Sequence, residues 1–262
     1  MTAPAVLFEA VGRVAKITIN RPEAMNAINM AVGTGLAEAL TRFSADPELR
    51  VAVITGAGDK AFSAGADLKA VAAGEMTRIS EAGKSGIGEL LRRYIDKPVI
   101  AAVNGYALGG GMEMALACDL IVASEKAEFG LPEVRRGLMA AGGGLLRLPR
   151  QMPMKTAMYY ILTGERMSAA DALRCGLVTQ VVAHEEVLEK ALALAERICA
   201  NAPVAVRESK AVAYQALDAS LYLSDEAWTI SDAAASRNRS SEDAAEGPRA
   251  FSEKRPPDWK GR

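Results

Sequence analysis

Histidine is nearly absent from this sequence, and its scarcity excludes several kinds of active site. The 262 residues contain a single histidine, His184, which stands at the expected start of a helix. Such a position favours a structural or capping role over catalysis. One histidine cannot form a multi-histidine metal site, and its isolation argues against a Ser-His-Asp triad. We therefore expect no metal site, and we expect carboxylates and backbone groups to carry any reaction.

Cysteine, net charge and long apolar runs are also limited. The three cysteines, Cys118, Cys175 and Cys199, are odd in number and lie in apolar helical stretches, which favours buried thiols in a reducing compartment over disulfides. A net charge of −1 predicts neither nucleic acid nor a membrane as a partner. No apolar run approaches the roughly 20 residues that span a bilayer, and no secretion signal is recognisable. We expect a cytoplasmic protein.

What the sequence does contain is typical of an α/β protein with a helical C-terminal region. With 50% hydrophobic and 24% charged residues, the chain can bury a sizeable core. A helix is expected from about residue 29 to residue 46, and helical patterns dominate from 185 to 250. Strand patterns are found at residues 14–19, 51–55, 98–103, 119–123 and 177–182. The last twelve residues, 251–262, are either a solvated tail or, given their two aromatics, a segment docked on a neighbouring surface.

Two glutamates in apolar surroundings are the main chemical signal. Glu113 lies among Met, Ala and Leu on a helix that opens with three glycines, and Glu133 follows Pro132. A carboxylate is costly to bury, so such a group is usually lost unless it has a role. Two of them around one cavity could add and remove water across a double bond. Taken alone, Glu113 could equally be a buried carboxylate with a nearby donor, and Glu133 a stabilising charge in the first turn of a helix.

Two glycine turns are the second signal. Residues 103–111 and 61–69 each follow a strand, and the first precedes a helix, where backbone N–H groups are free to bind negative charge. Either turn alone could be an ordinary tight connection, and the glycine spacing does not fit a dinucleotide site. Together, their backbone donors would form an oxyanion hole for a thioester enolate.

These segments resemble the crotonase (enoyl-CoA hydratase/isomerase) superfamily over nearly the whole chain. The resemblance implies a spiral of ββα units over residues 1–198 and a helical trimerisation region over 199–262, assembled as a trimer or as a hexamer of two trimers. The resembling segments are residues 21–28, 61–69, 104–119, 129–133 and 162–169.

The resemblance also implies a role for individual residues. The oxyanion donors would be the backbone N–H groups of Ala66 and Gly110. Glu113 would orient and activate water, and Glu133 would be the main proton donor and acceptor. The substrate would be an acyl-CoA thioester, with coenzyme A as part of the substrate and no separate cofactor. The remaining binding positions implied by the resemblance are Ala24, Ala27, Ile28, Ala64, Asp67, Leu68, Lys69, Pro132, Ala141, Phe251 and Lys254.

The reaction predicted from this resemblance is reversible syn hydration of a 2-enoyl-CoA to 3-hydroxyacyl-CoA. The carnitinyl-CoA dehydratases of the same superfamily are the second reading, because residues 96–105 and the C-terminal segment resemble them. A trimethylammonium group, as in their substrate, favours contact with aromatic faces or a carboxylate. These dehydratases are expected to have aromatic residues at two positions where this chain has Ala66 and Met112, and for that reason they rank second. An isomerase, or a silent acyl-CoA-binding subunit, is a further alternative.

One departure from the family pattern lies beside Glu133. The family usually has Pro and Gly where this chain has Ala140 and Ala141. The N–H of Ala141 could still help to hold water, whereas its methyl group would intrude and predicts a slower enzyme or a changed acyl preference. Residues 73–95 and 138–160, rich in Met and Ala, are expected near the acyl end, although Met at helical spacing is more often part of a core.

Overall fold

The computed structural model describes residues 3–72, 88–220 and 224–262. The chain divides into two compact units. The first comprises Met1–Ile95 and Val99–Ala195, and the second comprises Asp96–Pro98 and Glu196–Arg262.

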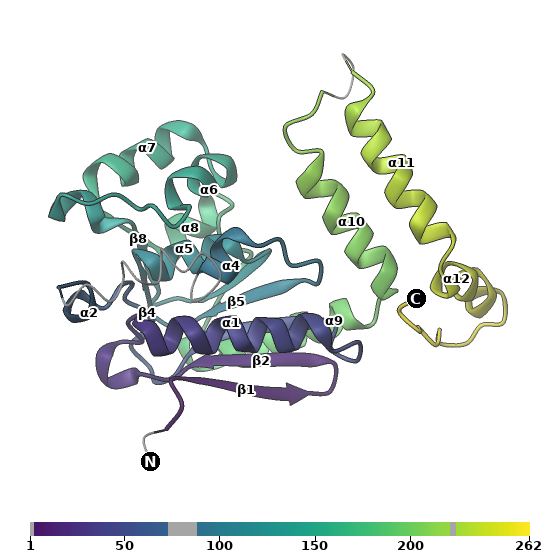
Figure 1. Ribbon diagram of the computed structural model, residues 1–262, viewed down its shortest axis with the longest axis horizontal. Helices are drawn as coiled ribbons and strands as arrows, with labels where there is room; N and C mark the ends of the chain where they lie inside the picture. Colours follow the sequence, from purple (N-terminus) through teal and green to yellow (C-terminus); the bar gives the residue numbers. More distant parts are fainter. Residues whose placement is uncertain (1–2, 73–87, 221–223) are drawn as a thin grey trace. The chain divides into compact units, whose positions relative to one another are not determined.

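A six-stranded sheet forms the centre of the first unit (Figure 1). Its order is β1-β2-β3-β5-β7-β10, with β1 antiparallel to β2 and the other neighbours parallel. The unbroken apolar runs of β3 and β5 are buried along their whole length, as expected for parallel strands covered on both faces. The strands are β1 Val6–Val11, β2 Val14–Ile19, β3 Val51–Gly56, β5 Val99–Val103, β7 Leu120–Ser124 and β10 Gln180–Val182.

A second sheet consists of four strands of three residues each, in the order β4-β6-β8-β9. Strands β4, β6 and β8 are parallel neighbours, and β9 is antiparallel to β8. The sequence did not predict these strands, because three residues are too few to show a period of two. They are β4 Ala61–Ser63, β6 Tyr106–Leu108, β8 Glu128–Gly130 and β9 Arg166–Ser168.

The two sheets are linked by a repeating ββα connection. Strand β3 leads to β4 and helix α2 (Leu68–Ala72), β5 leads to β6 and α5 (Gly110–Ala117), and β7 leads to β8 and the 3₁₀ helix η2 (Pro132–Arg136). Each repeat adds one strand to the same side of both sheets, so the chain advances as a spiral. The expected α/β spiral of ββα units is confirmed.

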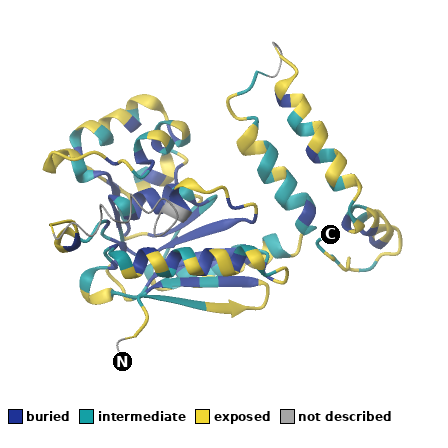
Figure 2. Ribbon diagram, in the orientation of Figure 1, coloured by how far each residue is buried: buried dark blue, intermediate teal, exposed yellow. Residues whose placement is uncertain are grey.

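Helix α1 (Met30–Ala45) packs on β1 and β2. The side chain of Asn29 caps it by accepting a hydrogen bond from the Val32 N–H at 3.1 Å. One face of α1 buries Leu36, Leu40 and Phe43, each contributing on the order of 1.5–3 kcal/mol, while the opposite face is exposed (Figure 2). The other helices of this unit are η1 Pro22–Ala24, α4 Gly88–Arg92, α6 Gly144–Gln151, α7 Met154–Thr163, α8 Ala169–Arg174 and η3 His184–Glu186, and α9 Val187–Cys199 runs on into the second unit.

The second unit contains α10 (Pro203–Gln215), α11 (Glu226–Arg239) and α12 (Glu242–Ser252). Its last residues fold back on it rather than forming a solvated tail. The indole N–H of Trp259 donates to the Ala200 carbonyl at 2.8 Å, and the Lys260 N–H donates to the buried Asp243 carboxylate at 2.6 Å. The docked alternative for residues 251–262 is therefore the correct one.

His184 and the cysteines have structural surroundings. His184 begins η3, and its Nδ1 lies 3.0 Å from the Ser124 Oγ. None of the three cysteines is in a disulfide, but only Cys118 is buried, so the expectation of buried thiols is wrong for the half-buried Cys175 and Cys199. Within the described residues, every helix is too short or too polar to cross a membrane.

Candidate active site

The predicted site residues follow three neighbouring strands of the small sheet. Ala66 comes after β4, Gly110 after β6 and Glu133 after β8. Parallel neighbours lie about 4.8 Å apart and end at the same edge of a sheet. These three residues, which are 44 and 23 positions apart in the sequence, are thereby brought to one edge, at equivalent places in successive repeats.

The two predicted oxyanion turns are in backbone contact. A Cβ added at Gly65 would lie 2.6 Å from the Leu108 carbonyl oxygen and 3.1 Å from the Gly110 nitrogen, and Gly65 has a φ of +88°. Only glycine meets both conditions. Gly110 is the first residue of α5, where a helix leaves its N–H without an internal partner. Among the described residues, neither the Ala66 N–H nor the Gly110 N–H has an acceptor.

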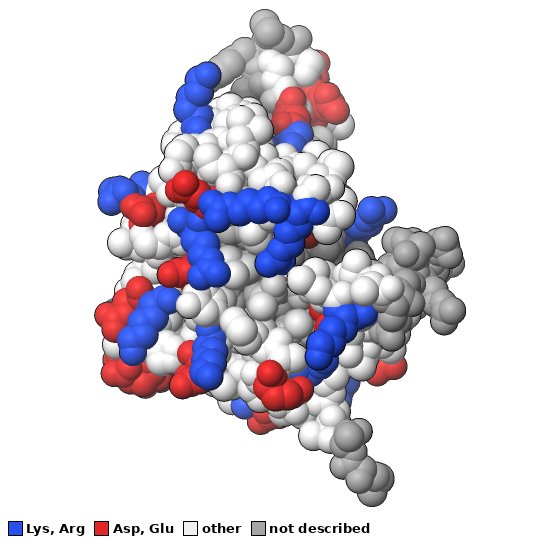
Figure 3. All heavy atoms as spheres, turned by 90° about the vertical axis from the view of Figure 1, so that its left-hand side faces the viewer, with Lys and Arg blue, Asp and Glu red and all other residues white. Residues whose placement is uncertain are grey.

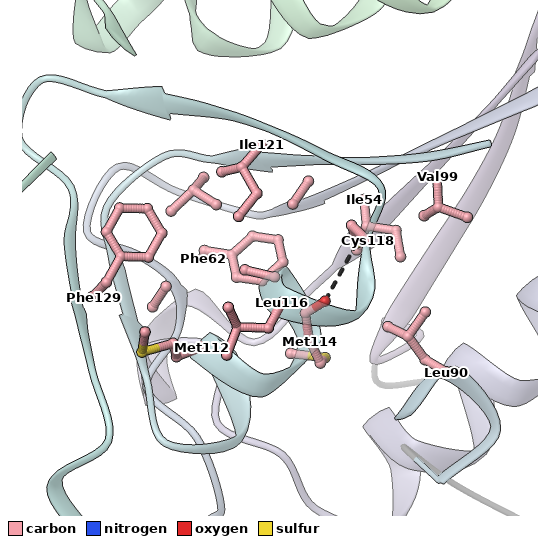
Figure 4. Close-up of a cluster of buried hydrophobic side chains, with 14 of the residues drawn as sticks. Ile54, Phe62, Leu90, Val99, Met112, Met114, Leu116, Cys118, Ile121 and Phe129 are labelled. Atoms are coloured by element: carbon pink, nitrogen blue, oxygen red, sulfur yellow. Dashed lines mark hydrogen bonds between the residues drawn. The ribbon is translucent and has the colours of Figure 1, made fainter. Parts of the chain in front are cut away.

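Glu113 is held by its helix on one side and by a glycine turn on the other. Its neighbours Met112, Met114 and Leu116 pack in the hydrophobic core with Phe62 and Phe129, which anchors α5 (Figure 4). Glu113 itself is only 5% exposed. Its Oε1 accepts a hydrogen bond from the Gly144 N–H at 2.9 Å.

Burial raises the pKa of Glu113 above its usual value. The backbone N–H groups of Gly144 and Gly142 and the charge of Arg147 act against this rise without cancelling it. A buried carboxyl group with a raised pKa can hold or release a proton nearer to neutral pH than a solvated one.

Glu133 lies against the turn that contains Gly109 and Gly110. A Cβ added at Gly109 would lie 3.1 Å from its Oε1. Burial raises the pKa of Glu133, the negative charge of Glu113 raises it further, and Arg136 lowers it. Its Oε2 is buried and has no hydrogen-bond partner among the described residues. An unpartnered buried carboxylate oxygen is unfavourable for folding, and such groups concentrate at functional sites.

The Ala141 N–H does not have the role expected for it beside the glutamates. Its N–H donates to the Met139 carbonyl oxygen at 2.8 Å, so that N–H is not free to hold water. Ala141 is exposed and its φ is not positive, so its methyl group is tolerated. The groups that contact Glu113 belong to Gly142 and Gly144 instead, and a Cβ added at Gly142 would lie 2.5 Å from the Glu113 Oε2.

The two predicted coenzyme A-binding loops lie side by side. The Ile28 N–H donates to the Gly65 carbonyl at 2.8 Å, and the Ala64 N–H donates to the Met25 carbonyl at 3.0 Å. The Asp67 carboxylate forms an ion pair with Arg21 at 3.1 Å, and it also accepts a hydrogen bond from the Lys69 N–H. These interactions lower the pKa of Asp67 although burial opposes them, so its side chain is occupied within the protein.

The structure does not bring all predicted positions together. Ala24, Ala27, Ile28, Ala64, Leu68 and Lys69 belong to the paired loops or the start of α2, and Pro132 opens η2 beside Glu133. Phe251, 86% exposed, and Lys254 belong to the second unit, so their contact with coenzyme A stays a prediction. Residues 73–87 of the stretch expected at the acyl end lie outside the described residues.

Residue-by-residue reading of the sequence missed several positions of the site. Gly142 and Gly144 were visible as a glycine run, but nothing in the sequence indicates that they contact Glu113. Arg147 of α6 donates to the Leu91 carbonyl of α4 at 2.5 Å and so ties the helix that begins at Gly144 to α4. Arg21 stood in a resembling segment without any assigned role, because its partner Asp67 is 46 residues away in the sequence.

A profile of the enoyl-CoA hydratase/isomerase family matches residues 9–262. The chain belongs to the enoyl-CoA hydratase/isomerase family. The resemblance predicted from the two glycine turns and the two glutamates is thereby confirmed.

Members of this family resemble the chain over its whole length. Carnitinyl-CoA dehydratase of Salmonella typhi is 46% identical over 256 residues, which are 96% of each protein. The crystal structure of enoyl-CoA hydratase from Mycobacterium tuberculosis H37Rv superposes with a TM-score of 0.93 at 45% identity, covering 99% of this chain and 100% of that one. That of carnitinyl-CoA hydratase from Mycobacterium avium has 51% identity and a TM-score of 0.77, with complete coverage of both chains.

Proposed function

We propose that this family member is a hydro-lyase that adds water to the 2,3-double bond of a coenzyme A thioester and removes it again. The observation that supports this best is the pair of glutamates with raised pKa values beside two backbone N–H groups that have no acceptor in the described structure. A hydratase needs both parts: donors for the thioester oxygen and two carboxyl groups for water and proton.

The N–H groups of Ala66 and Gly110 would receive the thioester carbonyl oxygen. As negative charge develops on that oxygen, the two donors stabilise it, and each is worth on the order of 10²–10³-fold in rate. Both donors are backbone groups on turns that touch each other. They would therefore need little rearrangement when the charge forms.

The two glutamates would divide the proton transfers. Glu113, oriented by the Gly144 N–H, holds the water and accepts one of its protons as the water oxygen bonds to C3. Glu133 delivers a proton to C2 and takes it back in the reverse direction, and its unpartnered Oε2 is available for this exchange. Each proton transfer typically contributes about 10²–10⁴-fold. The reaction needs no cofactor beyond the coenzyme A of the substrate.

For the acyl group we propose the trimethylammonium substrate pair crotonobetainyl-CoA and carnitinyl-CoA. Similarity to carnitinyl-CoA dehydratases at 46% identity and to a carnitinyl-CoA hydratase at 51% reverses the order expected from Ala66 and Met112. The cationic group is on C4, next to the carbon that water attacks, so an ionised carboxylate of the site would favour it electrostatically. An unsubstituted 2-enoyl-CoA is the second candidate, favoured by the superposition on enoyl-CoA hydratase.

Assembly as a trimer, or as a hexamer of two trimers, belongs to the same proposal. It rests on the family membership of the chain. Light scattering coupled to size-exclusion chromatography would distinguish a monomer, a trimer and a hexamer.

Glutamine variants of the two glutamates test the reaction. The purified protein is incubated with crotonobetainyl-CoA, crotonyl-CoA or a 3-enoyl-CoA, and the loss or gain of the conjugated enoyl absorbance is followed. We expect hydration of the first with the highest kcat/KM, and Glu133→Gln should reduce hydration at least a hundredfold with nearly unchanged thioester binding. Full activity in Glu133→Gln would refute the assignment.

The remaining outcomes separate the rival functions. Reaction with only the 3-enoyl-CoA would make the protein an isomerase. Binding without any turnover would make it an acyl-CoA-binding subunit. A higher kcat/KM for crotonyl-CoA than for crotonobetainyl-CoA would return the unsubstituted acyl chain to first place.

A further inference from the structure

The position of the Ala66 N–H is set by a neighbouring loop rather than by its own turn alone. The two backbone groups that flank Ala66 both hydrogen-bond to Ile28: the Gly65 carbonyl accepts from the Ile28 N–H at 2.8 Å, and the Asp67 N–H donates to the Ile28 carbonyl at 2.9 Å. The Ile28 Cδ1 also lies 3.0 Å from where a Cβ of Gly110 would be. Ile28 therefore touches the segments of both oxyanion donors.

The Arg21 guanidinium holds these two loops together. Its Nη1 donates to the Ala27 carbonyl at 2.7 Å and to the Asp67 Oδ2 at 3.1 Å. Ala27 precedes Ile28, and Asp67 follows Ala66. One guanidinium nitrogen therefore joins the neighbour of Ile28 to the neighbour of Ala66. The two side chains are about one-fifth exposed (20% and 17%), which leaves the ion pair less screened than one on the open surface.

Both partners of the ion pair are themselves held. The Arg21 N–H donates to the Asn26 Oδ1 at 3.0 Å, and the fully buried Asn26 donates from its Nδ2 to the Ala57 and Ala61 carbonyls. The Asp67 Oδ1 accepts from the Lys69 N–H at 3.1 Å at the start of α2. The connection therefore runs from the end of β3 and the start of β4, through Arg21, to the segment that contains Ala66.

We propose that the Arg21–Asp67 ion pair is a positioning element of the oxyanion hole, which fixes the Ala66 N–H relative to the Gly110 N–H. This inference rests on the proposed function of that site. Arg21 acts on the loops through Ala27 and Asp67 and does not bind the thioester. The competing role for Arg21 is direct contact with the phosphates of coenzyme A, and the two roles predict different kinetics.

Removing one charge at a time should lower kcat more than it changes KM. We expect Arg21→Met and Asp67→Asn to reduce kcat by about 10- to 100-fold, because a displacement of about 1 Å at a reacting centre costs up to roughly 10²-fold. KM should change by less than about threefold. Arg21→Lys should recover part of the lost kcat, because its ammonium can still reach Asp67 but cannot reproduce the planar guanidinium geometry.

A spectroscopic probe reports the oxyanion hole without turnover. The absorption of 4-dimethylaminocinnamoyl-CoA moves to longer wavelength when its thioester carbonyl is polarised by hydrogen bonds. We expect a red shift on binding to the wild-type protein and a smaller one in Arg21→Met and Asp67→Asn. The control variant is Glu9→Gln, which breaks the Lys16–Glu9 ion pair of 2.8 Å on β1 and β2 and should leave kcat and the red shift unchanged.

Three results would overturn the inference. The first is a raised KM with unchanged kcat in Arg21→Met, which assigns Arg21 to the coenzyme. The second is a red shift equal to that of the wild type in Asp67→Asn. The third is a loss of kcat in the Arg21→Met/Asp67→Asn double variant that equals the sum of the two single losses in free energy. If the two residues act as one ion pair, the double variant should lose no more than either single variant.

Failure of the positioning role and failure of the proposed reaction give different experimental results. Asp67→Asn is nearly isosteric and carries the test if Arg21→Met does not fold. A wild-type protein that shifts the probe but does not hydrate any enoyl-CoA would refute the hydratase and leave the positioning result intact.

Discussion

Replacing Gly142 with alanine should displace the Glu113 carboxylate while leaving the fold in place. A Cβ at Gly142 would lie 2.5 Å from the Glu113 Oε2 and 2.8 Å from the Leu91 Cδ1. Ordinary carbon–oxygen contacts lie at about 3.3 Å or more. The carboxylate must therefore retreat by about 0.8 Å, and its hydrogen bond from the Gly144 N–H, now 2.9 Å, must lengthen or bend.

The expected loss is larger in rate than in stability. A displacement of nearly 1 Å at a catalytic group costs about 10²-fold in kcat, which corresponds to about 2.7 kcal/mol of transition-state stabilisation. Both obstructing atoms are ends of side chains that can rotate, so we expect only about 1–2 kcal/mol of destabilisation from overpacking. KM should change little, because Gly142 is remote in the chain from both loops expected to bind coenzyme A.

Ala141→Gly is the matched control on the adjacent residue. The Ala141 methyl group is exposed, and its N–H already donates to the Met139 carbonyl, so removing the methyl should change kcat less than about twofold. Both variants are assayed by hydration of an enoyl-CoA and by thermal melting. Near wild-type kcat in Gly142→Ala, or a large gain in Ala141→Gly, would refute the assignment of the Glu113 contact to Gly142.

The remaining predictions concern pH and the second unit. Because burial raises the pKa of Glu133 above 4.5, the folded state binds more protons between the unfolded and folded pKa values, and stability is lost as pH rises through that window. Glu133→Gln should therefore raise Tm more at pH 8 than at pH 5, and an equal change at both would contradict the raised pKa. In the second unit, Asp243→Ala should destabilise by about 2 kcal/mol in urea unfolding, because it leaves the Lys260 and Gly261 N–H groups without their acceptor. Asp258→Ala, at an exposed ion pair, should change stability by less than about 0.5 kcal/mol, and equal losses in both variants would contradict the docked segment.

Most of the longer elements were predicted from the sequence, whereas the six-residue strand β1 and the four strands of the small sheet were not. The apolar runs that form β3 and β5 and the helix that begins after Asn29 have enough residues for a period to show, and Asn29 is a strong capping residue. The four strands of the small sheet have three residues each. Their pairing depends on backbone groups of distant segments, which leave no pattern in the local sequence.

The sequence by itself determined the chemistry that is available. It placed Glu113 behind a glycine turn, supplied a second glycine turn at Gly65, and left a single histidine for any other mechanism. These features, together with the resemblance they support, led to the family and to the candidate residues without any coordinates.

Only the tertiary structure decided how those groups meet. Parallel pairing of β4, β6 and β8 brings Ala66, Gly110 and Glu133 to one edge, because equivalent ends of neighbouring strands are about 4.8 Å apart whatever their separation in the chain. The folded chain also places the Gly142 and Gly144 N–H groups against Glu113, a contact that the sequence did not indicate.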